Sequence, residues 1–473
     1  MVRIFFNICL VVITTATFPS VGQAQSDVDI SPPRLIPKSV EAEGIPGTES
    51  IAPRARWGEA ENALTESEGG YSLDMLLGLA SQSNPTIRQA RMQISATLAQ
   101  ALQAGLYPNP RMTYLAENMN SGGTPGEFQG FEVEQRIVTA NKLELSRNKY
   151  LQRAKVAEHL AVAQQFKVCN DVRLHFVKTL AAEQKLKLKL EMLETAKDHL
   201  KTNRELFNLG QANEVDLRKA LADLKRHQLD YLSAQNELRS QFYMLTSLVG
   251  EELVPGPLKG SLYSDDECLI DFDAAYGRLL GESPEILAAY AKLKEDHITL
   301  HRENVEWVPD LVISGGPGYN FESQDAVANF SLSFEVPLYD RNQGTIRQAQ
   351  LDRNRQQQEI RRTELMLRKS LSEQYNKYIT ALQHIQSYDD DVLPESRKAY
   401  EQGLKSYQAN REEWPVVLDL HREYTMRRME QVDNRLAKCS AEIMMNGYLL
   451  HGGLEAAPSP TPPGHMDATP KPR

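Results

Sequence analysis

Apolar and polar positions alternate with a period of two in two regions of the chain. Over 326–338 every second side chain is apolar, so an extended strand would carry one apolar face, made of Ala326, Ala328, Phe330, Leu332, Phe334, Val336 and Leu338. Residues 130–137 alternate in the same way, and shorter stretches of this kind begin at 111 and 311. Gly-rich loops separate the two members of each pair. The pattern therefore predicts two β-hairpins, at about 109–138 and about 310–338.

A second pattern has helical spacing and extends over unusual lengths. Between Asn141 and about Asn208 the chain contains neither Pro nor Gly, and apolar residues recur every three or four positions. At about 1.5 Å per residue this helix would be roughly 100 Å long, more than a globular domain accommodates. A similar stretch runs from Thr345 to about Tyr407 and contains Pro394, which should kink or re-register its helix.

Each long helix is followed by a turn and a further helical stretch. Gly210 comes after Leu209 and can take the left-handed conformation that ends a helix, and Asn410 occupies the same place in the second region. The helices resume near Val215 and Pro415. The sequence therefore predicts two antiparallel helical hairpins, at about 141–249 with its tip near 210 and at about 343–450 with its tip near 410.

These elements recur in the same order with an offset of about 200 residues. The corresponding segments are SNP at 83–85 and SP at 283–284, YPNP at 107–110 and WVPD at 307–310, and VEQRIVTANK at 133–142 and FEVPLYDRNQ at 334–343. We interpret the body as an internal two-fold sequence repeat, with the first repeat at 70–255 and the second at 256–451. The expected fold class is mainly α with a small β part.

The segments outside the repeat differ from it in composition. The first residues carry Arg3, an apolar run through Ile13 and small residues up to Ala24, which predicts a Sec-type signal peptide at 1–24 and an exported protein. Residues 25–69 and 452–473 are rich in Pro, Ser, Glu and Gly, and we expect both segments to be disordered. Beyond the signal peptide no run of about 18 apolar residues occurs, so no membrane-spanning helix is expected.

Charge and candidate chemistry exclude several classes of function. The net charge is −10 and the 53 basic residues are scattered, so a nucleic-acid partner is not expected. His297 and His301 are spaced i, i+4, but two ligands are too few for a metal site. Cys169, Cys268 and Cys439 lack the spacing of a zinc site or a disulfide framework. Because the chain also has no Ser-His-Asp order, P-loop or Gly-rich nucleotide motif, we expect neither an enzyme nor a cofactor.

The apolar strand faces need a covering that the charged helices cannot supply. Strands of about ten residues with this alternation are typical of outer-membrane proteins, in which the apolar face contacts lipid. We therefore expect a lipid-facing strand that contains Phe330, Leu332, Phe334 and Val336. A half-buried hairpin on a soluble sheet is the alternative. Four strands cannot close a membrane barrel, which needs about eight, whereas three copies of the chain would supply about twelve.

The landmarks of both repeats together resemble a known family. The corners QRIVTANK at 135–142 and VPLYDRNQG at 336–344, and the tip NLG at 208–210 followed by Asp216, resemble TolC-type outer-membrane efflux proteins. The resemblance extends from about Ser72 to Leu450, and LAEN after YPNP looks closer to the heavy-metal, CzcC-like branch. It implies a homotrimer in the outer membrane, in which a twelve-stranded β-barrel continues into a tunnel of helical hairpins in the periplasm.

In this family the channel is the passive exit duct of a tripartite efflux system. The resemblance therefore implies two partners besides outer-membrane lipid, a periplasmic adaptor (membrane fusion) protein and an inner-membrane RND or ABC pump, with heavy-metal cations as candidate cargo. The pump would supply the energy, since the chain has no nucleotide site of its own. The alternative function is a soluble periplasmic coiled-coil adaptor or scaffold. The chain lacks the Gly- and Val-rich barrel domain that an adaptor normally carries between its helices.

The resemblance also assigns roles to individual residues. The strand-to-helix corners would contain Asn141, Pro337, Asn342 and Gly344. The hairpin-tip turns, which would contact the adaptor, would contain Leu209, Gly210 and Asn410. The first corner reads TANK where relatives usually carry a Gly before the Lys, which is expected to change the bend.

A periplasmic gate is expected at the two hairpin tips. By resemblance, three copies of Asp216 and of Asp419 would form acidic rings, which favour cations in a narrow pore. Tyr407 would join a hydrogen bond at the second tip. For the two aspartates the alternative is an ordinary solvated side chain in the first turn of a helix, where it complements the helix dipole. For Tyr407 the alternative is core packing.

Overall fold

A computed structural model describes the chain over residues 70–119, 126–210, 213–262, 269–409, 411–461 and 463–467. All of these residues belong to the unit Trp57–Arg473. Several features predicted from the sequence lie outside them, namely the signal peptide at 1–24, the segment 25–69, Cys268 and Asn410.

The first half of the chain contains two short helices, a strand pair and a helical hairpin. Its elements are β1 Tyr71–Ser72, α2 Leu73–Ser83, α3 Pro85–Ala104, β2 Arg111–Glu117, β3 Phe128–Ile137, α4 Lys142–Asn208 and α5 Glu214–Val249. Side-chain caps begin the short helices, because Ser72 accepts a hydrogen bond from the Met75 N–H and Asn84 accepts one from the Thr86 N–H. Helix α4 occupies the stretch without Pro and Gly and has 67 residues.

The second half repeats this order of elements. They are β4 Leu258–Lys259, α6 Phe272–Glu282, α7 Pro284–Val305, β5 Leu311–Asn320, β6 Asp325–Phe334, α8 Gln343–Ser387, η1 Tyr388–Val392, α9 Leu393–Gln408 and α10 Trp414–Asn446. Helices α3 and α7 begin alike, each with a Pro after a cap residue with φ near −60° and ψ near 125° (Asn84 and Ser283). The described residues are thus mainly helical with a small β part, as predicted.

Pro394 changes the register of the second hairpin without ending its helix. A π-turn, η1, lies between α8 and α9, and Pro394 is the second residue of α9. Pro has no N–H to donate, and its ring clashes with the carbonyl one turn earlier. The wider π-turn inserts one extra residue into that turn, so α9 continues from α8.

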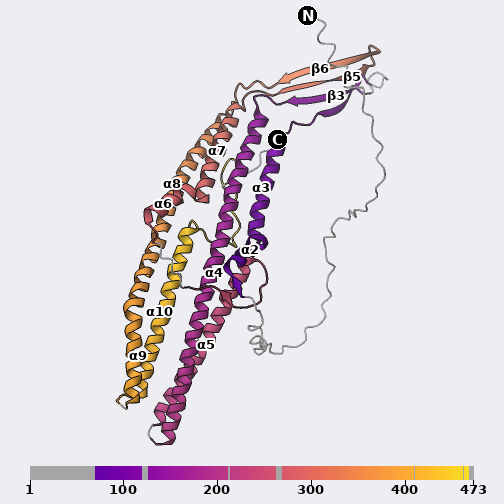
Figure 1. Cartoon of the computed structure of the whole chain (residues 1–473). Coiled ribbons are helices and arrows are strands. Elements are labelled where there is room, and N and C mark those ends of the chain that lie inside the picture. The colour runs from indigo at the N-terminus through magenta and orange to yellow at the C-terminus, as the bar shows by residue number, and fades with distance from the viewer. Residues whose placement is uncertain are drawn as a thin grey trace, which may run out of the picture. The chain divides into compact units, whose positions relative to one another are not determined.

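Four of the strands form an antiparallel sheet in the order β2-β3-β5-β6, and the two-residue strands β1 and β4 pair separately in parallel. Tyr114 is paired with Phe131, Val133 with Gly315, and Gly315 in turn with Phe330. Strands β2 and β6 are therefore the outer strands of this sheet. Figure 1 shows the strands beyond one end of α4, with the turns of both helical hairpins at the opposite end.

The second β-hairpin ends earlier than the alternation predicts. The alternating pattern continues to Leu338, but β6 ends at Phe334. Pro337 has no N–H for a ladder bond, and the Leu338 N–H turns back to the Val336 carbonyl at 2.9 Å. Val336 and Leu338 are therefore exposed beyond the strand, and side-chain alternation alone could not show where the backbone ladder ends.

Helix α4 contacts α2, α3, α5, α7 and α10, and the hydrophobic core is divided into clusters between the helices. One cluster joins α2, α4, α5 and α10 through Leu76, Val168, Val172, Leu245 and Val432. A second cluster joins α6, α8 and α10 through Leu279, Leu371, Tyr378 and Met445. These clusters hold the parts of the two helical hairpins that are distant from their tips. The tips are therefore held mainly by packing between the two helices of each hairpin.

The C-terminal segment differs from the expectation. Composition predicts disorder over 452–473, and this prediction is wrong for the described residues 452–461 and 463–467. His465 and Met466 are buried, and the Asp467 carboxylate pairs with Lys149 at 2.8 Å and with Arg153 at 2.9 Å. Composition misses this because the partners that hold the segment lie about 300 residues away in the sequence.

Among the described helices, none carries a stretch long and apolar enough to cross a bilayer.

Candidate functional site: a strand face, two corners and two hairpin tips

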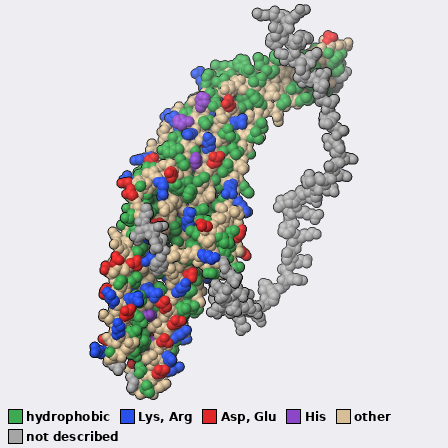
Figure 2. Space-filling model, in the orientation of Figure 1, with side chains coloured by type: hydrophobic (Ala, Val, Ile, Leu, Met, Phe, Trp, Pro, Cys, Tyr) green, Lys and Arg blue, Asp and Glu red, His purple; other side chains and the backbone are tan. Residues whose placement is uncertain are grey.

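The sheet exposes one apolar face. The exposed large hydrophobic side chains that share this face come from β2, β3 and β6 and are Met112, Tyr114, Phe131, Val133, Ile137, Phe330, Leu332 and Phe334. Phe330 is 76% exposed and Phe334 is 56% exposed. Figure 2 shows hydrophobic side chains gathered over the strands, whereas charges of both signs cover the helices towards the tips. A face of this size needs a partner surface or an apolar solvent.

The opposite face of the sheet is polar. Glu134 is paired with Ser314, and Ser314 with Ser331 across the next two strands. Glu132 shares this face because it lies two residues before Glu134. The sheet therefore separates an apolar side from a hydrophilic side, as strands around an aqueous lumen do.

A buried carboxylate, Asp310, ties the first corner together. It pairs with Lys142 at 2.9 Å and with Arg136 at 2.7 Å, and it accepts a hydrogen bond from the Thr139 N–H at 3.1 Å. Burial acts to raise the pKa of Asp310, but the hydrogen bonds from these three groups outweigh burial and hold the pKa below its ordinary value. This cluster joins the end of β3 and the start of α4 to the residue before β5, and sequence reasoning did not find it.

Both corners turn through residues in the left-handed conformation. Asn141 precedes α4 with φ 52°, and Asn342 precedes α8 with φ 60°. Asn is the residue after Gly that best tolerates this conformation. Asn342 also donates from its amide to the carbonyl and to the carboxylate of Glu303, both at 2.9 Å, which ties the second corner to α7. The aligned asparagines therefore have equivalent backbone roles. Pro337 is half-buried and Gly344 is exposed near this corner.

The first corner carries strain at Ala140, whose φ is 54°. The left-handed conformation costs an Ala roughly 1–2 kcal/mol, and Gly avoids this cost while losing roughly 0.5–1 kcal/mol more entropy on folding. We therefore expect Ala140→Gly to stabilise the protein by about 0.5 kcal/mol, measured from the thermal unfolding midpoint. The matched control is Ala222→Gly on the exposed side of α5, which should destabilise by about 1 kcal/mol. If Ala140→Gly destabilises the protein as much as Ala222→Gly does, the left-handed conformation of Ala140 does not strain the folded state.

The first hairpin tip ends α4 and starts α5 with standard caps. Gly210 has φ 71°, and its N–H donates to the Phe207 carbonyl at 3.0 Å. The Asn213 side chain accepts from the Asp216 N–H at 2.9 Å, which places Asp216 in the first turn of α5. Leu209 is 71% exposed, so the tip presents an apolar side chain to its surroundings.

The second tip has a different local structure. The Arg411 N–H donates to the Ser406 carbonyl at 2.9 Å, which closes the chain back onto the end of α9. Asn410 lies outside the described residues. The Tyr407 ring contacts Trp414, with ring centroids 4.8 Å apart. Tyr407 thus makes a packing contact at the tip. Asp419 is exposed on α10.

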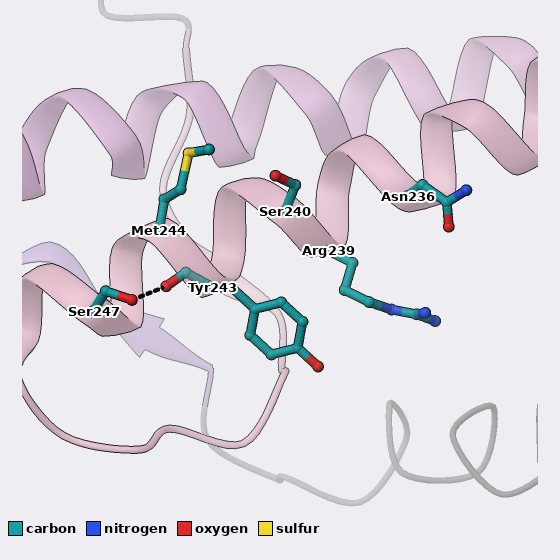
Figure 3. Close-up of a pocket in the computed structure, with 6 residues that line it drawn as sticks. All are labelled: Asn236, Arg239, Ser240, Tyr243, Met244 and Ser247. Atoms are coloured by element: carbon teal, nitrogen blue, oxygen red, sulfur yellow. Dashed lines mark hydrogen bonds between the residues drawn. The ribbon is translucent and has the colours of Figure 1, made fainter. Parts of the chain in front are cut away.

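A histidine pair, two cysteines and one surface hollow remain to be described. His297 and His301 are exposed on α7, and within the described residues no group of His, Cys, Asp and Glu side chains has the geometry of a metal site. Cys169 and Cys439 are free thiols, and burial raises the pKa of both. A hollow on α5, shown in Figure 3, is lined by Asn236, Arg239, Ser240, Tyr243, Met244 and Ser247. It contains none of the residues predicted from the sequence.

The chain matches one protein family over most of its length. The family described as "Outer membrane efflux protein" matches residues 76–251 and residues 275–444, once in each half. A curated relative is the cobalt-zinc-cadmium resistance protein CzcC of Cupriavidus metallidurans, with 24% identity over 363 residues, 76% of this chain and 84% of the relative. A second is the nickel-cobalt-cadmium resistance protein NccC of Alcaligenes xylosoxydans xylosoxydans, with 23% identity over 55% of this chain and 60% of the relative.

Solved structures share the fold. The outer-membrane channel OprN superimposes with a TM-score of 0.67 at 17% identity, covering 81% of this chain and 91% of OprN. CusC, described in connection with transmembrane channel formation, also gives 0.67 at 16% identity, covering 80% of this chain and 92% of CusC. The resemblance predicted from the corners and tips is thereby confirmed, and the soluble adaptor or scaffold is not supported. The chain belongs to the outer membrane efflux protein family.

Proposed function

We propose that this protein is the outer-membrane exit duct of a tripartite efflux system. The apolar face of the four-stranded sheet carries the proposal, because Phe330, Leu332 and Phe334 are exposed at the end of long helices whose opposite ends form the tips. In a bilayer this face would contact acyl chains, and its polar reverse would line water. Family membership supports the outer membrane as the location. The duct is passive and takes its energy from a pump.

We propose further that three copies assemble. Strands β2 and β6 are the outer strands of the sheet, and unpaired strand edges are not tolerated in lipid. Three sheets of four strands would close a barrel of about twelve. Helix α5 supports association below the barrel, because one of its faces exposes Leu221, Leu229, Leu232 and Tyr243 in the single chain. The family matches the chain once in each half and the order of elements recurs, and both observations support an internal repeat. With two helical hairpins per chain, three copies would place six similar hairpins around one tunnel.

The cargo that we propose is heavy-metal cations. Two relatives are named for resistance to cobalt, zinc, nickel and cadmium, which supports this class. Asp216 and Asp419 would line the narrow end of the tunnel as acidic rings, with Tyr407 beside them. The exposed Leu209, with Gly210 and Asn410 in the turns, would contact a periplasmic adaptor, and an inner-membrane RND or ABC pump would deliver the cations.

Assembly and conduction test the duct directly. Material from the outer-membrane fraction should run as a heat-modifiable trimer in gels and should give discrete conductance steps in planar bilayers. A monomer that is released by osmotic shock and stays in solution without detergent would refute the proposal.

The acidic gate predicts a change in ion preference. In the double variant Asp216→Asn, Asp419→Asn, we expect the cation-to-anion permeability ratio to fall about threefold, because six carboxylates leave the trimer's narrow end. The ratio is measured from the reversal potential across a salt gradient. Asp74→Asn is the matched control, since Asp74 is an exposed acid in the first turn of α2 and belongs to neither hairpin tip. Equal ratios in the double variant and the control would show that the two aspartates do not line the gate.

A further inference from the structure

The segment after α10 turns back and runs along α4. The Asn170 amide donates to the carbonyls of Gly447 and Leu450 at 2.8 and 2.9 Å. The Asp171 carboxylate accepts from the backbone N–H groups of Gly452 and Gly453 at 3.0 and 2.7 Å. Two adjacent side chains of α4 therefore bind the backbone of the segment that follows α10.

The next contacts lie further towards the N-terminus of α4. The buried Gln164 amide donates to the carbonyls of Gly453 and Glu455, both at 3.0 Å. A Cβ at Gly453 would lie 2.8 Å from the Val168 Cα, so only Gly fits this close approach. Backbone contacts of this kind, at successive turns of one helix, indicate a groove shaped for an extended peptide.

The Gly-His-Met-Asp end of the tail enters a cluster of buried charges. The His465 Nε2 lies 3.2 Å from Asp296 of α7 and 3.8 Å from Asp352 of α8. The Met466 N–H donates to Asp352 at 3.3 Å. The Asp467 carboxylate pairs with Lys149 and Arg153, which are one turn apart on α4. Three residues of the tail thus contact three helices from both halves of the chain.

The same charges also link the helices directly. Arg153 pairs with the fully buried Glu295 of α7 at 2.7 Å, and Lys292 pairs with Glu295 and Asp296 at 2.9 and 3.1 Å. Asp467 supplies Arg153 with a second carboxylate and is the partner of Lys149. Burial acts to raise the pKa of Asp467, but Lys149, Arg153 and His465 outweigh burial and hold that pKa at about 2, so Asp467 is charged at neutral pH.

We propose that the described residues 452–461 and 463–467 act as a built-in peptide ligand, which we call the latch. Its Gly-His-Met-Asp end occupies a charged groove of α4, α7 and α8 and ties the first half of the chain to the second. A sliding movement of α7 and α8 along α4 has to break the Asp467 pairs or carry the latch with it. The latch therefore sets the resting arrangement of the two halves, independently of which cargo the duct conducts.

Hydrogen exchange of the full-length protein in detergent tests the latch. We expect slow exchange at the amides of Gly452, Gly453 and Met466, whose N–H groups donate to carboxylates. Asp467→Asn leaves Lys149 and part of Arg153 unpaired, so exchange across 452–467 should rise on the order of a hundredfold. The matched control Glu455→Gln removes one charge from an exposed position of the same segment and should leave exchange unchanged.

Two further measurements separate release of the latch from loss of the fold. Exchange at the buried core of α5, around Leu245, should be the same in Asp467→Asn and the wild-type protein. A synthetic peptide of sequence GGLEAAPSPTPPGHMD, residues 452–467, should bind to Asp467→Asn, and the same peptide ending in Asn should bind at least about tenfold more weakly.

If Asp467→Asn unfolds, Gly453→Val is the second variant. It acts through the backbone contact with Val168 and leaves every charge in place, so it should release residues 452–455 alone. The proposal is overturned if the wild-type segment exchanges as fast as a free peptide, or if Asp467→Asn and Glu455→Gln have equal effects.

Discussion

Phe330→Arg is expected to prevent assembly of this protein in the outer membrane. Phe330 is the most exposed of the large hydrophobic residues of β6 and lies in the apolar row that crosses the sheet through Gly315 and Val133. An Arg at the bilayer midplane costs roughly 2–4 kcal/mol per copy, and a trimer would carry three. This total is comparable to the whole stability of an ordinary domain. We expect the heat-modifiable trimer to be lost from the outer-membrane fraction, as measured by immunoblot of fractions with and without heating.

Ser331→Arg is the matched control for this experiment. Ser331 follows Phe330 directly, so its side chain points to the other face of β6, and it is paired with Ser314 on the polar side of the sheet. An Arg in a hydrophilic lumen is tolerated. We therefore expect normal trimer levels and an altered conductance. If both variants assemble equally well, Phe330 does not face lipid.

Glu295→Gln is expected to destabilise the helical part by about 3–5 kcal/mol, the usual cost of breaking a buried ion pair. Glu295 is fully buried and accepts two hydrogen bonds from the Arg153 guanidinium, at 2.8 and 2.7 Å. Its loss leaves Arg153 with Asp467 alone and Lys292 with Asp296 alone. Helix α4 of the first half would then separate from α7 more easily.

The midpoint of chemical unfolding, followed by the helical circular dichroism signal in detergent, measures this effect. Glu285→Gln is the control because Glu285 belongs to the first turn of the same helix and interacts mainly with its dipole. The control should lose less than about 1 kcal/mol. A loss of that small size at Glu295 would mean that the buried pair contributes little to holding the halves together.

The features that sequence predicted best depend on neighbouring residues. The absence of Pro and Gly over Lys142–Asn208, and a Gly at the position of positive φ that follows, describe α4 and its end. The alternation over β3 and β6 separates an exposed apolar face from a polar one. Each of these patterns involves residues within about one or two helical turns of one another, or on neighbouring strands. It can therefore be recognised in a single sequence.

The features that sequence missed join residues far apart in the chain. Asp310 contacts Arg136 and Lys142 across about 170 residues, and Asp467 contacts Lys149 across 318. An acid in a corner or in a Pro-rich tail looks solvated when it is considered alone. The composition of the tail also predicts disorder, because the tail has few apolar residues. Composition does not show that Gln164 donates hydrogen bonds to the carbonyls of Gly453 and Glu455.

The fold class, the alternating strands, the hairpin turns and the resemblance to outer membrane efflux proteins can be recognised from the amino-acid sequence alone, because local sterics and hydrophobic periodicity leave their marks in every stretch of chain. By contrast, sequence patterns do not show where β6 ends, how Asp310 ties the first corner, or that the C-terminal segment lies across α4, α7 and α8. Those outcomes depend on which buried charges and backbone groups meet after folding, and that pairing has no local signature.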